Sequence, residues 1–176
     1  MLDADPEFKM TGIVADALIW ADMRDVGSHG VFRLPRYFAI MDRGEMDPRA
    51  KVEPRLSLPA ALVFEANRAF GPVAMMKATA AACDQARKVG VCYAIVSHTT
   101  HTGAIGYFSN WAAERGFAAI VASAGSANMA YHGARVPSLS TSPLAIAVPG
   151  GSRATSRSSR VVRSTQRWAR ASSRNG

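Results

Sequence analysis

A serine, a histidine and an arginine lie close together in the segment Ser28-His29-Gly30-Val31-Phe32-Arg33. An imidazole with an ordinary pKa of about 6.5 exchanges protons near neutral pH. A guanidinium four residues further on can hold a carboxylate through two parallel hydrogen bonds. Interconversion of a 2-hydroxy acid and a 2-keto acid needs both, because one group must exchange the hydroxyl proton and a cation must orient the acid. The same spacing also fits a capping serine followed by a surface histidine and a surface arginine.

A second polar segment, Ser97–Gly103, lies between a predicted strand and a predicted helix. Backbone N–H groups at the start of such a helix favour an anionic ligand. His98 and His101 are three residues apart with no third ligand nearby, so the spacing does not favour a metal site. Two small polar loops, Gly125-Ser126 and Ser140–Pro143, are compatible with cofactor contact and equally with ordinary turns.

The motifs that mark several nucleotide-binding and hydrolase folds are absent. The sequence contains no G-x-G-x-x-G, no G-x-x-x-x-G-K-[ST] and no G-x-S-x-G. A Rossmann dinucleotide fold, a P-loop NTPase and an α/β-hydrolase are therefore disfavoured.

Apolar periodicity predicts the elements that must position these residues. We expect helices at 12–24, 31–42 (interrupted by Pro35), 72–88 and 104–115, and strands at 91–96, 117–123 and 143–148. Residues 43–60 carry Pro48, Pro54 and Pro59 and are interpreted as a surface connection or an irregular edge. Strands that alternate with helices indicate an α/β fold whose loops hold the functional groups.

Composition sets the broad class of the chain. Apolar residues make up 48% of the 176 residues against 19% charged, which is typical of a folded chain. The two cysteines form no close pair, no apolar run could span a bilayer, and the N-terminus lacks a secretory signal. We therefore expect a cytoplasmic protein without membrane segments.

The excess of positive charge comes from residues 151–176, which contain no acid. On a helix their seven arginines would form one basic face able to bind phosphates, so an alternative function is a non-catalytic fragment whose tail binds nucleic acid or another polyanion. Abundant serine and a single aromatic residue make nucleic acid the less favoured partner. We expect this tail to be disordered or out of frame. The arginines are Arg153, Arg157, Arg160, Arg163, Arg167, Arg170 and Arg174.

Taken in order, several motifs resemble the non-Rossmann malate/L-lactate dehydrogenase family, which includes ureidoglycolate, sulfolactate, 2,3-diketogulonate and piperideine-2-carboxylate oxidoreductases. The resemblance covers about residues 12 to 150. It rests on Ala21-Asp22, Ser28–Val31, Arg33–Pro35, His101–Ala104, Gly106-Tyr107, Thr141-x-Pro143 and Ala145–Pro149.

The resemblance implies hydride transfer between NAD or NADP and a small 2-hydroxy acid, on a homodimer with a mixed sheet and flanking helices. His29 matches the acid/base histidine, Ser28 its relay partner, and Arg33 the arginine that binds the substrate carboxylate. His101 matches a histidine that is a catalytic base in some members and a cofactor contact in others. Thr141 matches a cofactor contact, and Thr102, Gly103 and Ser126 complete the cofactor candidates.

The domain organisation expected from this resemblance is an oxidoreductase part at 1–150, followed by the tail. Within it, 1–60 would be a helical substrate-side segment and 61–150 a cofactor-side α/β segment. The chain differs from the usual family pattern at His98-Thr99-Thr100 and at Ser140-Thr141-Ser142-Pro143. We interpret the chain as a truncated N-terminal half of such an enzyme.

Overall fold

The computed structural model describes residues 10–130, 132–150 and 159–162. The chain divides into two compact units, residues 1–108 and 109–176, and helix α4 (Gly106–Glu114) contains the boundary. The division expected near residue 60 therefore falls inside the first unit. Of the expected tail, residues 151–158 and 163–176 lie outside the described residues.

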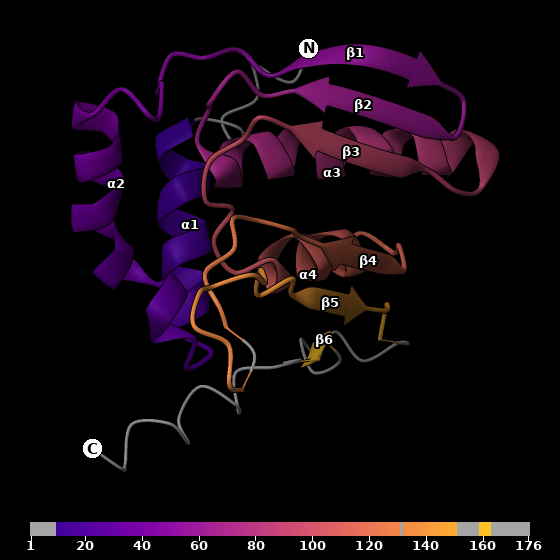
Figure 1. The fold of residues 1–176 in the computed structure, drawn as a ribbon. Helices are drawn as coiled ribbons and strands as arrows, with labels where there is room; N and C mark the ends of the chain where they lie inside the picture. The colour runs from indigo at the N-terminus through magenta and orange to yellow at the C-terminus, as the bar shows by residue number, and fades with distance from the viewer. Residues whose placement is uncertain (1–9, 131, 151–158, 163–176) are drawn as a thin grey trace. The chain divides into compact units, whose positions relative to one another are not determined.

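The first unit begins with two helices joined by tight turns (Figure 1). Helix α1 (Met10–Asp22) buries the predicted apolar stripe, including Ile13 and Leu18. Two short 3-10 turns, η3 (Gly27–His29) and η4 (Val31–Arg33), lead into helix α2 (Leu34–Asp42). Pro35 lies in the first turn of α2, where its missing N–H has no helical partner to lose. It therefore begins this helix, whereas we had expected it to interrupt a helix over residues 31–42.

The sheet of the first unit has the strand order β1-β2-β3. Strand β1 (Glu53–Leu58) pairs antiparallel with β2 (Ala61–Glu65), and β2 pairs parallel with β3 (Tyr93–Ser97). The expectation that 1–60 is a helical segment is thus wrong for β1, whereas an irregular edge, one of the two interpretations of 43–60, agrees with it. β1 is an exposed edge strand with a register shift next to Pro54, and such an edge is a place where a sheet tolerates proline.

Helix α3 (Gly71–Val89) makes the crossover between the two parallel strands and packs on one face of the sheet. Leu62 and Phe64 of β2 are buried with Ala74 and Ala78 of α3. Gly90 ends the helix in the left-handed conformation, with a φ of 90°. Helices beside a sheet of parallel and antiparallel pairs confirm the expected α/β class.

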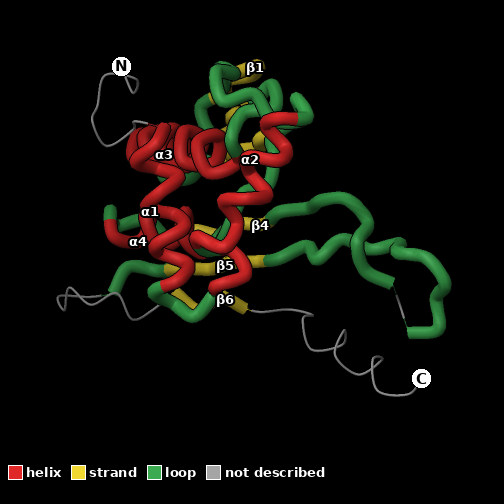
Figure 2. The backbone as a smooth tube through the Cα atoms, turned by 90° about the vertical axis from the view of Figure 1, so that its left-hand side faces the viewer, coloured by secondary structure: helices red, strands yellow, loops and turns green. Residues whose placement is uncertain are grey.

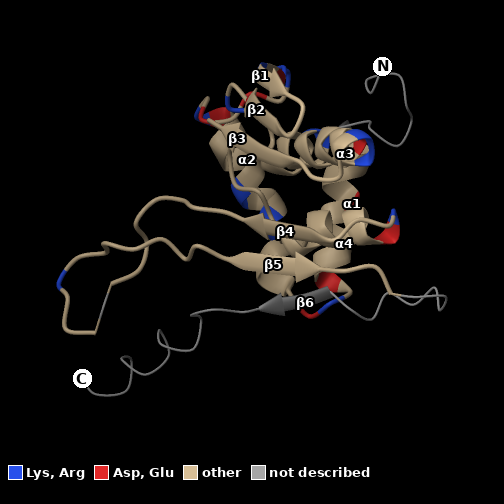
Figure 3. Cartoon of the chain, turned by 90° about the vertical axis from the view of Figure 1, so that its right-hand side faces the viewer, with Lys and Arg blue, Asp and Glu red and all other residues tan. Residues whose placement is uncertain are grey.

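The second unit holds a smaller antiparallel sheet of β4 (Ala119–Ala122), β5 (Leu144–Ala147) and β6 (Ser159–Val162). Between β4 and β5 the chain forms a long hairpin arm, joined by an isolated bridge between Met129 and Leu139 (Figure 2). Between residues 116 and 150 the only Lys, Arg, Asp or Glu is Arg135, so strands β4 and β5 are drawn without charge in Figure 3.

Strand β6 bears on the expected tail. Arg160 lies in this strand and not on a helix, and the other six arginines of the tail lie outside the described residues. Within the described part of the chain, no helix is long and apolar enough to cross a membrane.

Candidate functional site

The segment from Ser28 to Arg33 is held in a compact turn by its own backbone and by the end of α1. The carboxylate of Asp22 accepts a hydrogen bond from the Val31 N–H at 2.9 Å. A Cβ on Gly30 would lie 1.7 Å from Asp22 Oδ1, so only glycine allows the carboxylate this position. Arg33 Nε donates to the Ser28 carbonyl at 2.5 Å, which joins the two ends of the segment. The histidine and the arginine are thereby fixed relative to each other.

The second histidine loop is fastened to the start of α3. The Thr100 hydroxyl accepts a hydrogen bond from the Gly71 N–H at 3.1 Å and donates to the Ala69 carbonyl at 3.0 Å. A Cβ on Gly71 would lie 2.2 Å from the His101 carbonyl oxygen. Gly71 therefore allows the backbone of His101 to approach the helix closely.

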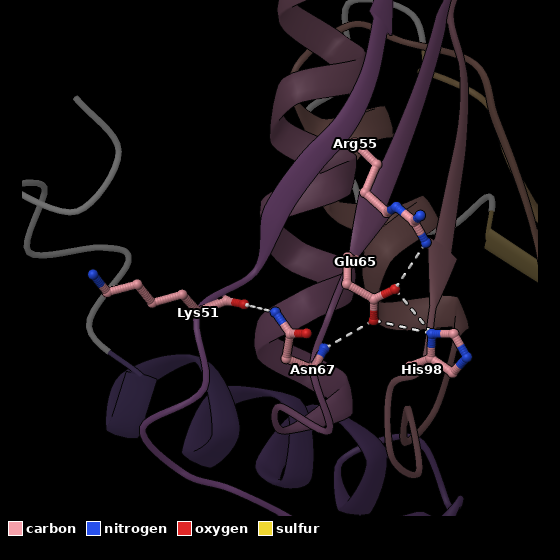
Figure 4. Close-up of polar contacts among 5 residues, drawn as sticks. All are labelled: Lys51, Arg55, Glu65, Asn67 and His98. Atoms are coloured by element: carbon pink, nitrogen blue, oxygen red, sulfur yellow. Dashed lines mark hydrogen bonds and ion pairs between the residues drawn. The ribbon is translucent and has the colours of Figure 1, made fainter.

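A polar cluster fixes the beginning of the same loop (Figure 4). Glu65, at the end of β2, accepts a hydrogen bond from His98 Nδ1 at 2.9 Å and one from the Asn67 N–H at 3.1 Å, and Arg55 lies 3.5 Å away. The hydrogen bond from His98 is the main reason that the pKa of Glu65 is lowered. His98 has a left-handed φ of 51°, a conformation that a side chain usually avoids. The cluster thus holds the loop at its first residue.

His29 and His101 stack, with ring centroids 5.3 Å apart and an interplanar angle of 28°. Ser28 Oγ lies 2.9 Å from His29 Nδ1. The structure therefore brings together Ser28, His29, Arg33 and His101, four of the candidate residues named from the sequence, within the first unit. His98 is not part of this group, because its ring is bonded to Glu65.

Tyr37 is a member of the site that the sequence analysis missed. It is 2% exposed, and its hydroxyl lies 3.1 Å from His101 Nδ1. The Gly103 N–H donates to the same nitrogen at 3.2 Å. A backbone N–H can only donate, so Nδ1 is an acceptor, the Tyr37 hydroxyl donates to it, and neutral His101 carries its proton on Nε2. The available signal was the position of Tyr37, one helical turn after Arg33.

Burial and positive charge keep this group uncharged apart from its arginines. Burial, then Arg33, His29 and Arg36, lower the pKa of His101 to about 4. Burial and then Arg33 lower the pKa of His29. Burial raises the pKa of Tyr37, against the opposing effect of Arg33. Near neutral pH both imidazoles are neutral, and Tyr37 is a protonated donor.

The remaining cofactor candidates divide between the two units. Thr102 and Gly103 directly follow His101, and the Thr102 hydroxyl makes no hydrogen bond among the described residues. Ser126 and Thr141 belong to the second unit, Ser126 exposed and Thr141 half-buried. No group of three or more His, Cys, Asp or Glu residues that could hold a metal occurs in the described part of the chain.

Comparison with known proteins shows the family of this chain. The sequence pattern that defines malate/L-lactate dehydrogenases matches residues 6–157. The chain belongs to the malate/L-lactate dehydrogenase family. Its expected fold class is confirmed by solved members, among them the sulfolactate dehydrogenase of Methanocaldococcus jannaschii, with a TM-score of 0.77 and 28% identity over 86% of this chain and 43% of that one.

Curated relatives match the same part of the family. A malate dehydrogenase of Pyrococcus abyssi is 34% identical over 78% of this chain and 38% of its own length. A ureidoglycolate dehydrogenase (NAD(+)) of Escherichia coli K12 is 31% identical over 78% of this chain and 39% of its own length. The chain thus spans well under half the length of these relatives.

Proposed function

We propose that this protein takes part in hydride transfer between a nicotinamide cofactor, NAD or NADP, and a small 2-hydroxy acid of the malate or lactate type. The observation that carries the proposal is the joining of Arg33 to Ser28 and His29 in one turn, with the ring of His101 stacked on His29. This combination offers a cation for a carboxylate beside a group that exchanges a proton. Membership of the malate/L-lactate dehydrogenase family supports the same reaction class.

In this proposal Arg33 binds the substrate carboxylate. Its Nε is already bonded to the Ser28 carbonyl, which fixes the plane of the guanidinium. Its two terminal nitrogens make no hydrogen bond among the described residues and can hold both oxygens of a carboxylate. The acid is then oriented with its 2-hydroxyl group toward the histidines.

His29 is the proton acceptor when the hydroxy acid is oxidised. Because its pKa is lowered, the neutral ring that can accept a proton predominates near neutral pH. With Nδ1–H donating to Ser28 Oγ, Nε2 is free to take the hydroxyl proton. In the direction of reduction the same nitrogen returns the proton.

His101 is a hydrogen-bond donor in this scheme. Its Nδ1 already accepts from Tyr37 and Gly103, so the group it offers is Nε2–H. A ring with a pKa of about 4 is also a poor proton acceptor beside His29. Of the two roles implied by the family resemblance, contact with the cofactor therefore suits His101 better than that of base.

The donor chemistry around His101 fits a nicotinamide cofactor. The Nε2–H of His101, the unbonded hydroxyl of Thr102 and the backbone at Gly103 would hold it. Ser126 and Thr141, in the second unit, stay cofactor candidates from the sequence alone. When bound, the cofactor supplies the hydride acceptor or donor. The name of the E. coli relative supports NAD, while NADP stays an alternative. The homodimer implied by the family resemblance and the cytoplasmic location expected from the sequence also stay predictions.

The proposal is tested by titrating the chain with malate and with lactate, and following the His29 and His101 ring resonances by NMR. We expect both acids to shift these resonances in the wild-type chain and not in Arg33→Gln. Arg49→Gln is the matched control, since Arg49 is an exposed arginine of the same unit that does not affect either histidine. No shift in the wild-type chain, or the same shift in Arg33→Gln, would contradict the proposal. Addition of NAD or NADP and a coupled test for turnover then identifies the cofactor.

A further inference from the structure

Helix α3 begins without a capping side chain of its own. Its N-cap residue is Phe70, which makes no side-chain hydrogen bond to the helix, and its second residue, Pro72, has no N–H. The N–H of Gly71, the first residue, has no acceptor within the helix. Because Gly71 is buried, this N–H needs an acceptor from another part of the chain.

Thr100 supplies that acceptor from the loop that carries His101. Its hydroxyl accepts a hydrogen bond from the Gly71 N–H at 3.1 Å and donates to the Ala69 carbonyl at 3.0 Å. Its own N–H donates to the same carbonyl at 3.3 Å. Met46 Sδ lies 3.6 Å from the hydroxyl oxygen. One side chain thus joins the loop to the start of α3.

Thr100 is also the point at which the backbone next to His101 is held. The N–H and the carbonyl of His101 make no hydrogen bond among the described residues, although a Cβ on Gly71 would clash with that carbonyl. Met46, beside the Thr100 hydroxyl, packs in the same buried cluster as Tyr37. The Tyr37 hydroxyl in turn lies 3.1 Å from His101 Nδ1. The place of Thr100 therefore governs whether the His101 ring reaches its partners.

We propose that Thr100 is the positioning residue of His101. Its hydroxyl holds the loop against α3, so that the His101 ring stacks on His29 and accepts the hydrogen bond from Tyr37. Backbone groups use the hydroxyl of Thr100 both as donor and as acceptor, so Thr100 acts through His101 and not on a ligand. The inference rests on the proposed function, because that function gives the orientation of His101 Nε2–H its importance.

Two neighbouring threonines of the loop provide the variants for a test. Thr100→Val keeps the shape of the side chain but leaves the Gly71 N–H without an acceptor, whereas Thr100→Ser keeps the hydroxyl. Thr100→Ala, in which a water can reach this N–H, carries the same expectation as Thr100→Val and takes its place if that variant does not fold. Thr99→Val is the matched control, because the buried Thr99 hydroxyl has no hydrogen-bond partner among the described residues.

NMR on the chain without ligand measures the pKa of His101 and the NOE between the rings of His29 and His101. We expect Thr100→Val to weaken this NOE and to raise the pKa of His101 from about 4 to above about 5, because the ring loses burial, the main cause of its low pKa. Thr100→Ser and Thr99→Val should keep both wild-type values. The Gly71 N–H of the wild-type chain should exchange slowly with solvent, a measurement that needs no variant.

The outcomes separate a positioning role from a structural one. If Thr100→Val unfolds at a lower urea concentration but keeps the wild-type NOE and His101 pKa, the contact only stabilises the fold and the inference is overturned. The same changes in Thr99→Val or Thr100→Ser, or fast exchange of the Gly71 N–H in the wild-type chain, would also overturn it. A wild-type chain that responds to neither malate nor lactate overturns the proposed function, while the measurements without ligand still decide the role of Thr100.

Discussion

The neutral state of His101 predicts that the first unit loses stability in mild acid. The pKa of His101 in the folded chain is about 4, below its ordinary value of 6.5. The unfolded chain therefore binds a proton at this residue more readily than the folded chain does. The contribution of His101 to the free energy of unfolding is complete above pH 6.5 and is lost as the pH falls toward 4.

The size of the effect follows from the two pKa values. A difference of one in pKa corresponds to about 1.4 kcal/mol, which limits the total loss at His101 to about 3 kcal/mol. Between pH 7 and pH 5 the expected loss is about 2 kcal/mol. The lowered pKa of His29 acts in the same direction. The pKa values of Glu65 and Glu45 are lowered from 4.5, so these carboxylates act below this window.

Urea unfolding of the wild-type chain and of His101→Gln at pH 7 and pH 5 measures this loss. The indole resonance of Trp20 reports on the first unit, because Trp20 is buried in α1. Between pH 7 and pH 5, we expect the free energy of unfolding of the wild-type chain to drop by about 2 kcal/mol more than that of His101→Gln. A direct NMR titration of the His101 ring gives the folded pKa independently. Equal pH dependence in the two proteins, or a His101 pKa near 6.5, would refute the assignment of a buried, neutral ring beside cations.

Three further predictions follow from the same contacts. Arg33→Gln should raise the pKa of both His29 and His101, because Arg33 lowers both, and NMR titration measures the two values. An unchanged pKa of His29 would show that Arg33 does not lie close to this ring. Gly30→Ala should lower the free energy of unfolding by about 1.5–3 kcal/mol, because it displaces Asp22 from its hydrogen bond with the Val31 N–H. In a chain that already carries Asp22→Ala the loss should be much smaller, and unfolding experiments in which the two losses add would contradict this packing. If turnover is observed, kcat/KM for oxidation should rise with pH through the lowered pKa of His29 and then level off, whereas a rate that falls over this range would exclude His29 as the base.

The sequence predicted the parts of the site that are continuous in the chain. Ser28, His29 and Arg33 stand within one short segment. Their residue types and spacing left both acid chemistry and an ordinary surface turn open, and the family resemblance favoured the first. The stacking of His101 on His29 could not follow from spacing, because it depends on Gly71 allowing a close approach of backbone. Tyr37 was missed because a buried tyrosine on an amphipathic helix is usually part of the core.

The fold shows the same limit. Helices α1 and α3 and strand β3 were predicted because their apolar pattern is set locally. Strand β1 was not predicted as a strand because Pro54 within it and Pro59 directly after it are typical of a connection or an irregular edge, and only pairing with β2 makes the segment a strand. Elements set by the local apolar pattern were predictable, whereas the pairing of strands and the close approach of distant backbone segments were not.

His98 and His101 show how position alone separates two like residues of one loop. His98 is exposed, and its ring is bonded to the carboxylate of Glu65, so it fastens the loop. His101, three residues later, is half-buried, faces Arg33 and receives two hydrogen bonds on Nδ1. The imidazole of His98 therefore donates to an acid and fastens the loop, whereas the neutral imidazole of His101 offers its Nε2–H. His29, with Nδ1 toward a hydroxyl that can donate or accept, is the histidine to which the proposed reaction assigns the proton transfer at Nε2.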